Sequence, residues 1–143
     1  MNGSQDKRAR LKPRSQFVST VMMFLVLILC DSCSILSQKK QTELTQTLWF
    51  YRSAIRWGRY TDALEFQKNP QKDFNFLSVS DVKVSWYTVE RKAFSDDGDR
   101  LDQTVEIRYI REPGIVEKTI FDQQTWLYED DGWVLDGELP HFK

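Results

Sequence analysis

Apolar residues recur at helical intervals in the segment that begins near Thr42. The intervals of four, three and four residues place these side chains on one face of an α-helix: Leu44, Leu48, Tyr51 and Ile55. Thr42 is a suitable N-cap, and Gly58 can adopt the left-handed conformation that ends a helix. A second, short helical turn is predicted over 61–66, before Asn69 and Pro70 end it.

Beyond Pro70 the period changes to two residues, which is typical of half-buried strands. The clearest alternating runs are Val82, Val84 and Trp86, and Val105, Ile107 and Tyr109. Turn sequences that contain glycine separate the runs at 97–98, 113–114 and 131–132. Four strands are predicted, over roughly 80–93, 101–111, 115–128 and 133–136. The fold class is therefore α+β, with a helix packed on a curved four-stranded antiparallel meander.

The first thirty residues have the pattern of an export signal. A basic segment that ends at Arg14 precedes the uncharged run 17–30. A membrane-spanning helix needs about 20 apolar residues, so this run is short for one. The segment therefore predicts a leader that directs the rest of the chain across a membrane, and an uncleaved single-pass anchor is the alternative.

Both cysteines lie directly after the apolar run, in the sequence LILCDSCSILSQ. This passage resembles the cleavage region of bacterial lipoproteins, in which a small residue precedes the cysteine that receives the lipid. Cys33, between Ser32 and Ser34, fits better than Cys30, which follows the bulky Leu29. By this resemblance Ser34 favours sorting to the outer membrane. The predicted organisation is a leader at 1–33, a tether at 34–41 and one α+β domain at 42–143.

Charge and composition exclude several classes of function. Lysine and arginine total 20 and aspartate and glutamate 21; five basic and two acidic residues precede Ser34, which leaves 15 and 19. A body with net charge −4 argues against nucleic acid as a partner. After cleavage at Cys33 the body has no cysteine for a disulfide, a thiol nucleophile or a zinc site.

The sequence contains few residues that could bind a metal or act as catalytic groups. His141 is the single histidine and lies near the C-terminus, so we expect a surface or tail-packing role. The acidic run SDDGDRLD lacks the closing glutamate of a calcium loop and is interpreted as a hairpin tip. No metal, cofactor or catalytic residue is predicted.

A resemblance adds to this interpretation. The phrases AIRWGRYTDALEF (54–66) and TWLYEDDGWVLDGELPHF (125–142), in this order of helices and strands, resemble NTF2-like and cystatin-like domains, in particular those of small proteobacterial lipoproteins. NTF2-like enzymes place an acid and a tyrosine or second acid inside the concavity of the sheet, which implies Asp122 or Asp136 with Tyr87 or Tyr109. The structural alternative is that these aspartates are exposed and the tyrosines belong to the core.

Basic and aromatic residues also share positions on the first helix. Arg52, Arg56 and Arg59 are spaced so that they could contact anionic lipid headgroups or an acidic partner, and the alternative is a solvated face paired with acids such as Asp62. Trp49 and Trp57 fall on one side of this helix, where core packing is the commoner use.

The sequence therefore predicts a membrane-anchored, periplasm-facing envelope lipoprotein that acts as a non-enzymatic binding or assembly module. The expected partner is another envelope protein or a small apolar ligand held between helix and sheet. A pocket enzyme of the isomerase or dehydratase type, or a small-ligand carrier, is the alternative.

Overall fold

The computed structural model describes residues 38–130 and 132–143. The predicted leader, Cys30 and Cys33 lie outside these residues. Lys39–Lys143 form one unit of the chain. Within the described ranges, no helix combines the length and the apolar character needed to cross a bilayer.

A long helix occupies residues 38–56, and its apolar stripe is buried as predicted. Gly58 has a φ of +66°, and its N–H donates to the carbonyl of Ile55 at 3.2 Å, which confirms the predicted helix end. Residues 38–41, assigned to the tether, are already helical, so the N-cap at Thr42 is wrong. Tertiary contacts hold this extra turn, because Lys40 pairs with Asp99 and its carbonyl accepts the indole N–H of Trp133.

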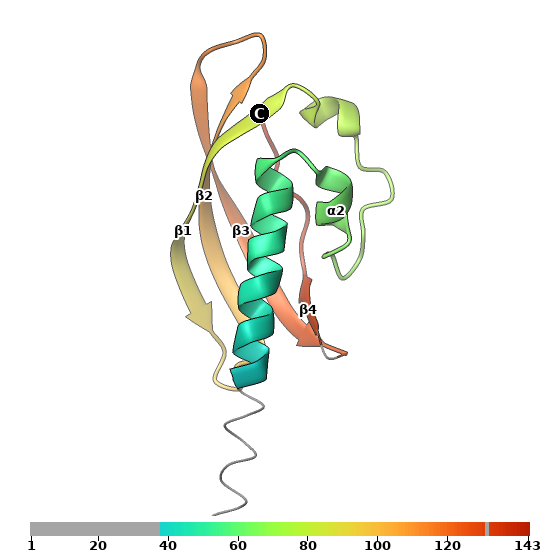
Figure 1. Cartoon of the computed structure of the whole chain (residues 1–143), viewed down its shortest axis with the longest axis vertical. Helices are drawn as coiled ribbons and strands as arrows, with labels where there is room; N and C mark the ends of the chain where they lie inside the picture. The colour runs from blue at the N-terminus through green and yellow to red at the C-terminus, as the bar shows by residue number, and fades with distance from the viewer. Residues whose placement is uncertain (1–37, 131) are drawn as a thin grey trace, which may run out of the picture. The chain divides into compact units, whose positions relative to one another are not determined.

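Four strands form one antiparallel sheet in the order β1-β2-β3-β4, which confirms the predicted meander. The long helix lies across one face of this sheet (Figure 1). The bounds of the strands are β1 Val82–Phe94, β2 Arg100–Arg111, β3 Glu117–Glu129 and β4 Gly132–Leu135. Two short helices connect the long helix to β1, namely α2 (Tyr60–Leu64) and the 3-10 helix η1 (Phe76–Val79).

The pairing of β1 with β2 shifts register twice, between Val84 and Trp86 and between Val89 and Arg91. Each bulge moves the following side chains to the opposite face of the sheet. The predicted inward position of Trp86 is therefore wrong: Trp86 is 52% exposed, and Tyr87 is buried in its place. The alternation predicted for β2 is confirmed, because Val105, Ile107 and Tyr109 are all buried.

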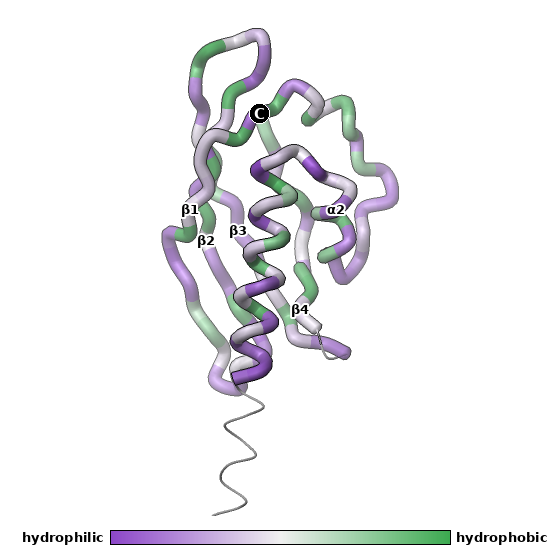
Figure 2. Tube along the Cα trace, viewed as in Figure 1, coloured by the Kyte–Doolittle hydropathy of each residue, from purple (hydrophilic) through white to green (hydrophobic). Residues whose placement is uncertain are grey.

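The core is built from the helix stripe and the inner sides of all four strands. The fully buried ring of Trp126 meets Tyr51 edge to face at 5.1 Å, with Phe66 beside both rings. Apolar positions alternate with polar ones along the helix and the strands (Figure 2). Trp126 and Trp133 are buried, but Trp49 (61% exposed) and Trp57 (75%) are not, so their expected core packing is wrong.

The hydroxyl of Tyr51 supports a prediction about stability. This side chain is fully buried, and its hydroxyl has no hydrogen-bond partner among the described residues. An unpaired buried hydroxyl costs about 1–3 kcal/mol. We expect Tyr51→Phe to raise the free energy of unfolding by about 1 kcal/mol, whereas Tyr51→Ala lowers it by about 4 kcal/mol by leaving a cavity. Urea denaturation measures both changes, and a Phe variant that loses stability contradicts the prediction.

Candidate functional site

A cavity of about 400 Å³ lies between the first half of the long helix and β1. Its apolar walls are made by Leu44 and Leu48, one helical turn apart, and by Val89 and Phe94 of β1. Trp49 adds an aromatic side at the surface. The dimensions and the apolar lining are typical of a site for a small ligand.

The second β1 bulge decides which strand residues reach the cavity. After the bulge, Lys92 pairs with Gln103 and Phe94 with Leu101, and the partner residues of β2 are buried on the helix side. Directly paired residues of antiparallel strands share a face of the sheet. Lys92 and Phe94 therefore line the cavity, while Arg91 is directed to the opposite face.

The floor of the cavity is polar. Gln103 is 3% exposed, and its side-chain amide donates to Oε1 of Gln124 at 2.7 Å. Its own Oε1 has no hydrogen-bond partner among the described residues. A buried amide oxygen without a donor is costly, and this one has less than 1 Å² of exposed surface, so a ligand N–H or O–H reaches it only if the side chain shifts toward the cavity.

A hydrogen-bond network behind the floor is centred on Gln124. Its amide nitrogen lies 3.0 Å from the hydroxyl of Tyr87 and 2.7 Å from Oδ2 of Asp122, and its Oε1 accepts the indole N–H of Trp126 at 3.2 Å. Burial raises the pKa of Tyr87, which stays a neutral hydroxyl. The network fixes the amide of Gln103, and with it the direction of the unpaired oxygen.

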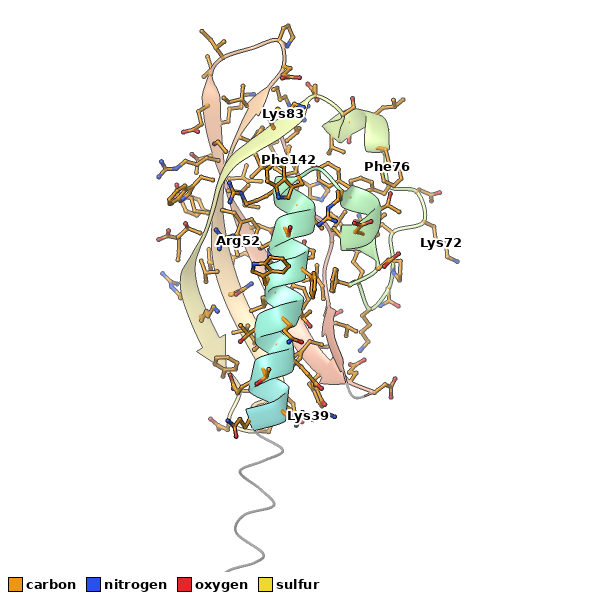
Figure 3. The ribbon with its side chains drawn as sticks, viewed as in Figure 1. Lys39, Arg52, Lys72, Phe76, Lys83 and Phe142 are labelled. Atoms are coloured by element: carbon orange, nitrogen blue, oxygen red, sulfur yellow. The ribbon has the colours of Figure 1, made fainter. Side chains whose placement is uncertain are left out.

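Two cations flank the mouth of the cavity. Arg52 lies on the side of the helix that faces β1 (Figure 3), with its guanidinium 5.8 Å from the centre of the Tyr87 ring. Lys92 approaches from the strand. Both side chains are exposed, and the structure records no ion pair for either within the described ranges. The mouth therefore attracts an anionic group.

The residues implied by the resemblance to NTF2-like enzymes are only partly assembled. Asp122 and Tyr87 meet through Gln124, but Asp122 is not among the described residues that line the cavity. Asp136 is exposed, and the hydroxyl of Tyr109 bonds the backbone of Lys143 in the C-terminal tail. Asp122 is partly buried, so the alternative that both aspartates are exposed is wrong for it.

Burial raises the pKa of Asp122 to about 6, and its hydrogen bond from Gln124 offsets part of that effect.

The other acidic and histidine residues are solvated or paired with neighbours. Nε2 of the exposed His141 lies 2.8 Å from Glu138. Asp97 caps the β1–β2 turn by accepting the N–H of Asp99 at 3.0 Å, which confirms the predicted hairpin tip. Within the described ranges, no three acidic, histidine or cysteine residues are grouped to hold a metal.

The predicted arginine stripe divides into two parts. Arg59 lies beyond the helix and pairs with Asp62 at 3.3 Å, which confirms the local pairing for this residue. Arg52 and Arg56 stay exposed on the helix and border a groove of about 270 Å³ with Trp49 and Trp57.

The sequence did not predict Gln103, Gln124 or Lys92 as residues of a site. A signal for the first was present, because Gln103 interrupts the alternating apolar row of β2 between Leu101 and Val105. Lys92 had no such signal, because the bulge between Val89 and Arg91 decides which face of the sheet its side chain is on, and that bulge forms only when β1 pairs with β2.

No family model, curated protein or solved structure matches this chain.

The raised pKa of Asp122 predicts a pH-dependent stability. The folded-state pKa of about 6 lies above 3.8, the ordinary pKa of an aspartate, so ionisation opposes folding, and stability falls as the pH rises from about 4 to about 7. We expect Asp122→Asn to raise the free energy of unfolding by about 2 kcal/mol near pH 7.5 and to have little effect near pH 4.

Urea denaturation at the two pH values measures this difference. Asp136→Asn is the matched control, because Asp136 is an exposed aspartate that follows β4. A stabilisation by Asp122→Asn that is equal at both pH values contradicts the prediction.

Proposed function

We propose that this chain is a periplasm-facing envelope lipoprotein, anchored by lipid on Cys33, whose α+β domain is a non-enzymatic binding module. The domain holds a small apolar ligand with an acidic head group between the long helix and β1. The observation that carries the proposal is the cavity, with apolar walls, the side chain of Gln103 on its floor, and Arg52 and Lys92 at its mouth.

Each part of the cavity supports one property of the ligand. Walls made by leucine, valine and phenylalanine favour an alkyl chain or ring, because burial of apolar surface contributes about 25 cal/mol per Å². The polar side chain of Gln103 on the floor favours a ligand that carries one polar group at that end. The two cations favour a carboxylate, sulfonate or phosphate at the surface.

The position of Asp122 supports a role without catalysis. A general base must come within hydrogen-bond reach of the bound substrate. Asp122 is held by Gln124 and does not belong to the described lining of the cavity. The ligand is therefore carried or sensed, and we keep the isomerase or dehydratase type of enzyme as the alternative.

We also assign the domain to the NTF2-like or cystatin-like type. A long helix across one face of a four-stranded antiparallel meander supports this assignment. The anchor rests on the sequence LILCDSCSILSQ, and Ser34 supports the outer membrane as its location. The acidic body supports a partner other than nucleic acid.

Ligand binding can be tested with dodecanoate and the fluorescent anion anilinonaphthalene sulfonate. We expect the dye to gain fluorescence on binding and dodecanoate to displace it. Lys92→Gln should weaken dodecanoate binding about fivefold, because it removes one cation from the mouth. Leu48→Trp should abolish displacement by filling the apolar part of the cavity.

Arg91→Gln is the matched control for this experiment, because Arg91 precedes Lys92 on the same strand and is directed to the other face of the sheet. Equal affinities in the Lys92→Gln and Arg91→Gln variants would exclude the cavity as the binding site. Native mass spectrometry of the purified protein adds a second readout, since a mass lost on denaturation identifies a ligand that was carried through purification.

The anchor gives a separate prediction. We expect Cys33→Ala to move the protein from the membrane fraction to the soluble fraction, because a diacyl group supplies most of the membrane affinity of such a chain. Cys30→Ala should leave the protein in the membrane fraction. The opposite pair of results would assign the lipid to Cys30, and retention of both variants would favour an uncleaved leader.

A further inference from the structure

Large aromatic rings and arginines gather on the solvent-exposed part of the long helix, which reaches from its outer side to Arg52 at the edge near β1. We call this set the aromatic–arginine face, and its members are Trp49, Phe50, Arg52, Arg56 and Trp57. The rings of Trp49 and Phe50 are in edge contact at 5.0 Å, and both are more than half exposed. Exposure of several aromatic rings on one helix to water is unfavourable and uncommon in soluble domains, so these rings indicate a contact surface.

The charge of this face differs from that of the rest of the body. No aspartate or glutamate occurs between Leu44 and Trp57, although the body from Ser34 onward has net charge −4. Arg56 is exposed, and the structure records no ion pair for it within the described ranges. The face therefore presents a local positive charge that complements an anionic surface.

The arrangement of the side chains fits phosphate groups. Arg52 and Arg56 are one helical turn apart and border the groove of about 270 Å³, with Ser53 between them and Trp49 and Trp57 on its sides. Guanidinium groups bind phosphate oxygens with two parallel hydrogen bonds. Tryptophan rings prefer the headgroup region of a bilayer, where one part of the ring is apolar and its N–H is hydrated.

We infer that the aromatic–arginine face lies on the surface of an anionic phospholipid bilayer. The combination of exposed tryptophan and arginine favours a bilayer over an acidic protein, because both side chains are suited to the headgroup layer. This contact is additional to the lipid anchor and orients the domain on the membrane.

The short predicted tether makes such a contact accessible, and this step rests on the proposed anchor at Cys33. Four residues separate Cys33 from residue 38, where the described helix is already present. The five Cα–Cα steps from Cys33 to residue 38 span at most about 18 Å. The helix over 38–56 extends about 28 Å, so a helix that lies along the membrane brings Trp49 and Trp57 to the headgroups at high effective concentration.

The contact can be tested with the full chain reconstituted in vesicles of phosphatidylcholine or of phosphatidylcholine with phosphatidylglycerol, each with a brominated acyl chain. Bromine quenches tryptophan that reaches the bilayer. We expect quenching in the anionic vesicles to exceed that in the neutral ones about threefold and to decrease at high salt. Arg56→Gln should reduce it to about the neutral level.

Matched variants assign the signal to this face. Trp57→Phe should remove part of the quenching, whereas Trp86→Phe should leave it unchanged, because Trp86 is exposed on the opposite face of the sheet. Arg91→Gln controls for the loss of one positive charge elsewhere. Quenching that is equal in neutral and anionic vesicles, or that persists in Arg56→Gln, would overturn the inference. A chain that shows no quenching in either vesicle would overturn it as well and would leave this face to a protein partner.

The two proposals fail separately. Arg56 and Trp57 do not line the helix–sheet cavity in the described residues, so their variants should leave dodecanoate binding unchanged. Flotation of the vesicles reports the anchor independently of quenching. A protein that floats without quenching retains the proposed anchor and refutes the bilayer contact. A protein that does not float, but is quenched when anionic vesicles are added, supports the contact and refutes the anchor.

Discussion

The edge-to-face contact between Tyr51 and Trp126 is the point at which the helix is seated on the sheet. Both side chains are fully buried, and their ring centres are 5.1 Å apart. Trp126 pairs with Leu101 of β2 and with Leu135 of β4, so this one contact joins the helix to three strands. The position of the helix then brings Lys40 to the β1–β2 turn and leaves its outer face uncovered. The helix–sheet cavity and the aromatic–arginine face both follow from that placement of the helix.

Among the strands, β1 contributes the most residues to the cavity. β1 is an edge strand of the sheet, and two bulges rotate its side chains along its length. The first bulge turns Trp86 outward and Tyr87 inward, and the second brings Lys92 and Phe94 to the helix side. Bulges are common near binding sites because they redirect single side chains without breaking the sheet. In this domain they place a tyrosine, a lysine and a phenylalanine around one hollow.

The polar groups on the inner face of the sheet are neutral and buried, whereas the arginines on the long helix are charged and exposed. Gln103, Gln124 and Tyr87 are buried neutral groups whose hydrogen bonds fix their positions. A polar group in such surroundings is costly when unpaired, as the oxygen of Gln103 is among the described residues. Arg52 and Arg56 are solvated and contribute long-range attraction instead. The carboxylates of the described body are concentrated at turns and in local pairs such as Arg59–Asp62 and Arg100–Asp102.

The sequence by itself determined the element order, the four-stranded meander and the buried stripe of the long helix. These features depend on local periodicity and turn residues, as the burial of Ile55 and Val105 and the positive φ of Gly58 demonstrate. The network that joins Asp122 to Tyr87 required the tertiary structure, because Gln124 of β3 bonds Tyr87 of β1, and β2 lies between these two strands. The exposure of Trp49, Trp57 and Trp86 was also decided by the tertiary structure. Hydrophobicity predicts only that an aromatic ring prefers burial. The long helix packs one face against the sheet, so rings on its other sides stay exposed, and a bulge reverses which side chains of a strand face the core. The packing of the elements therefore decides which rings are buried.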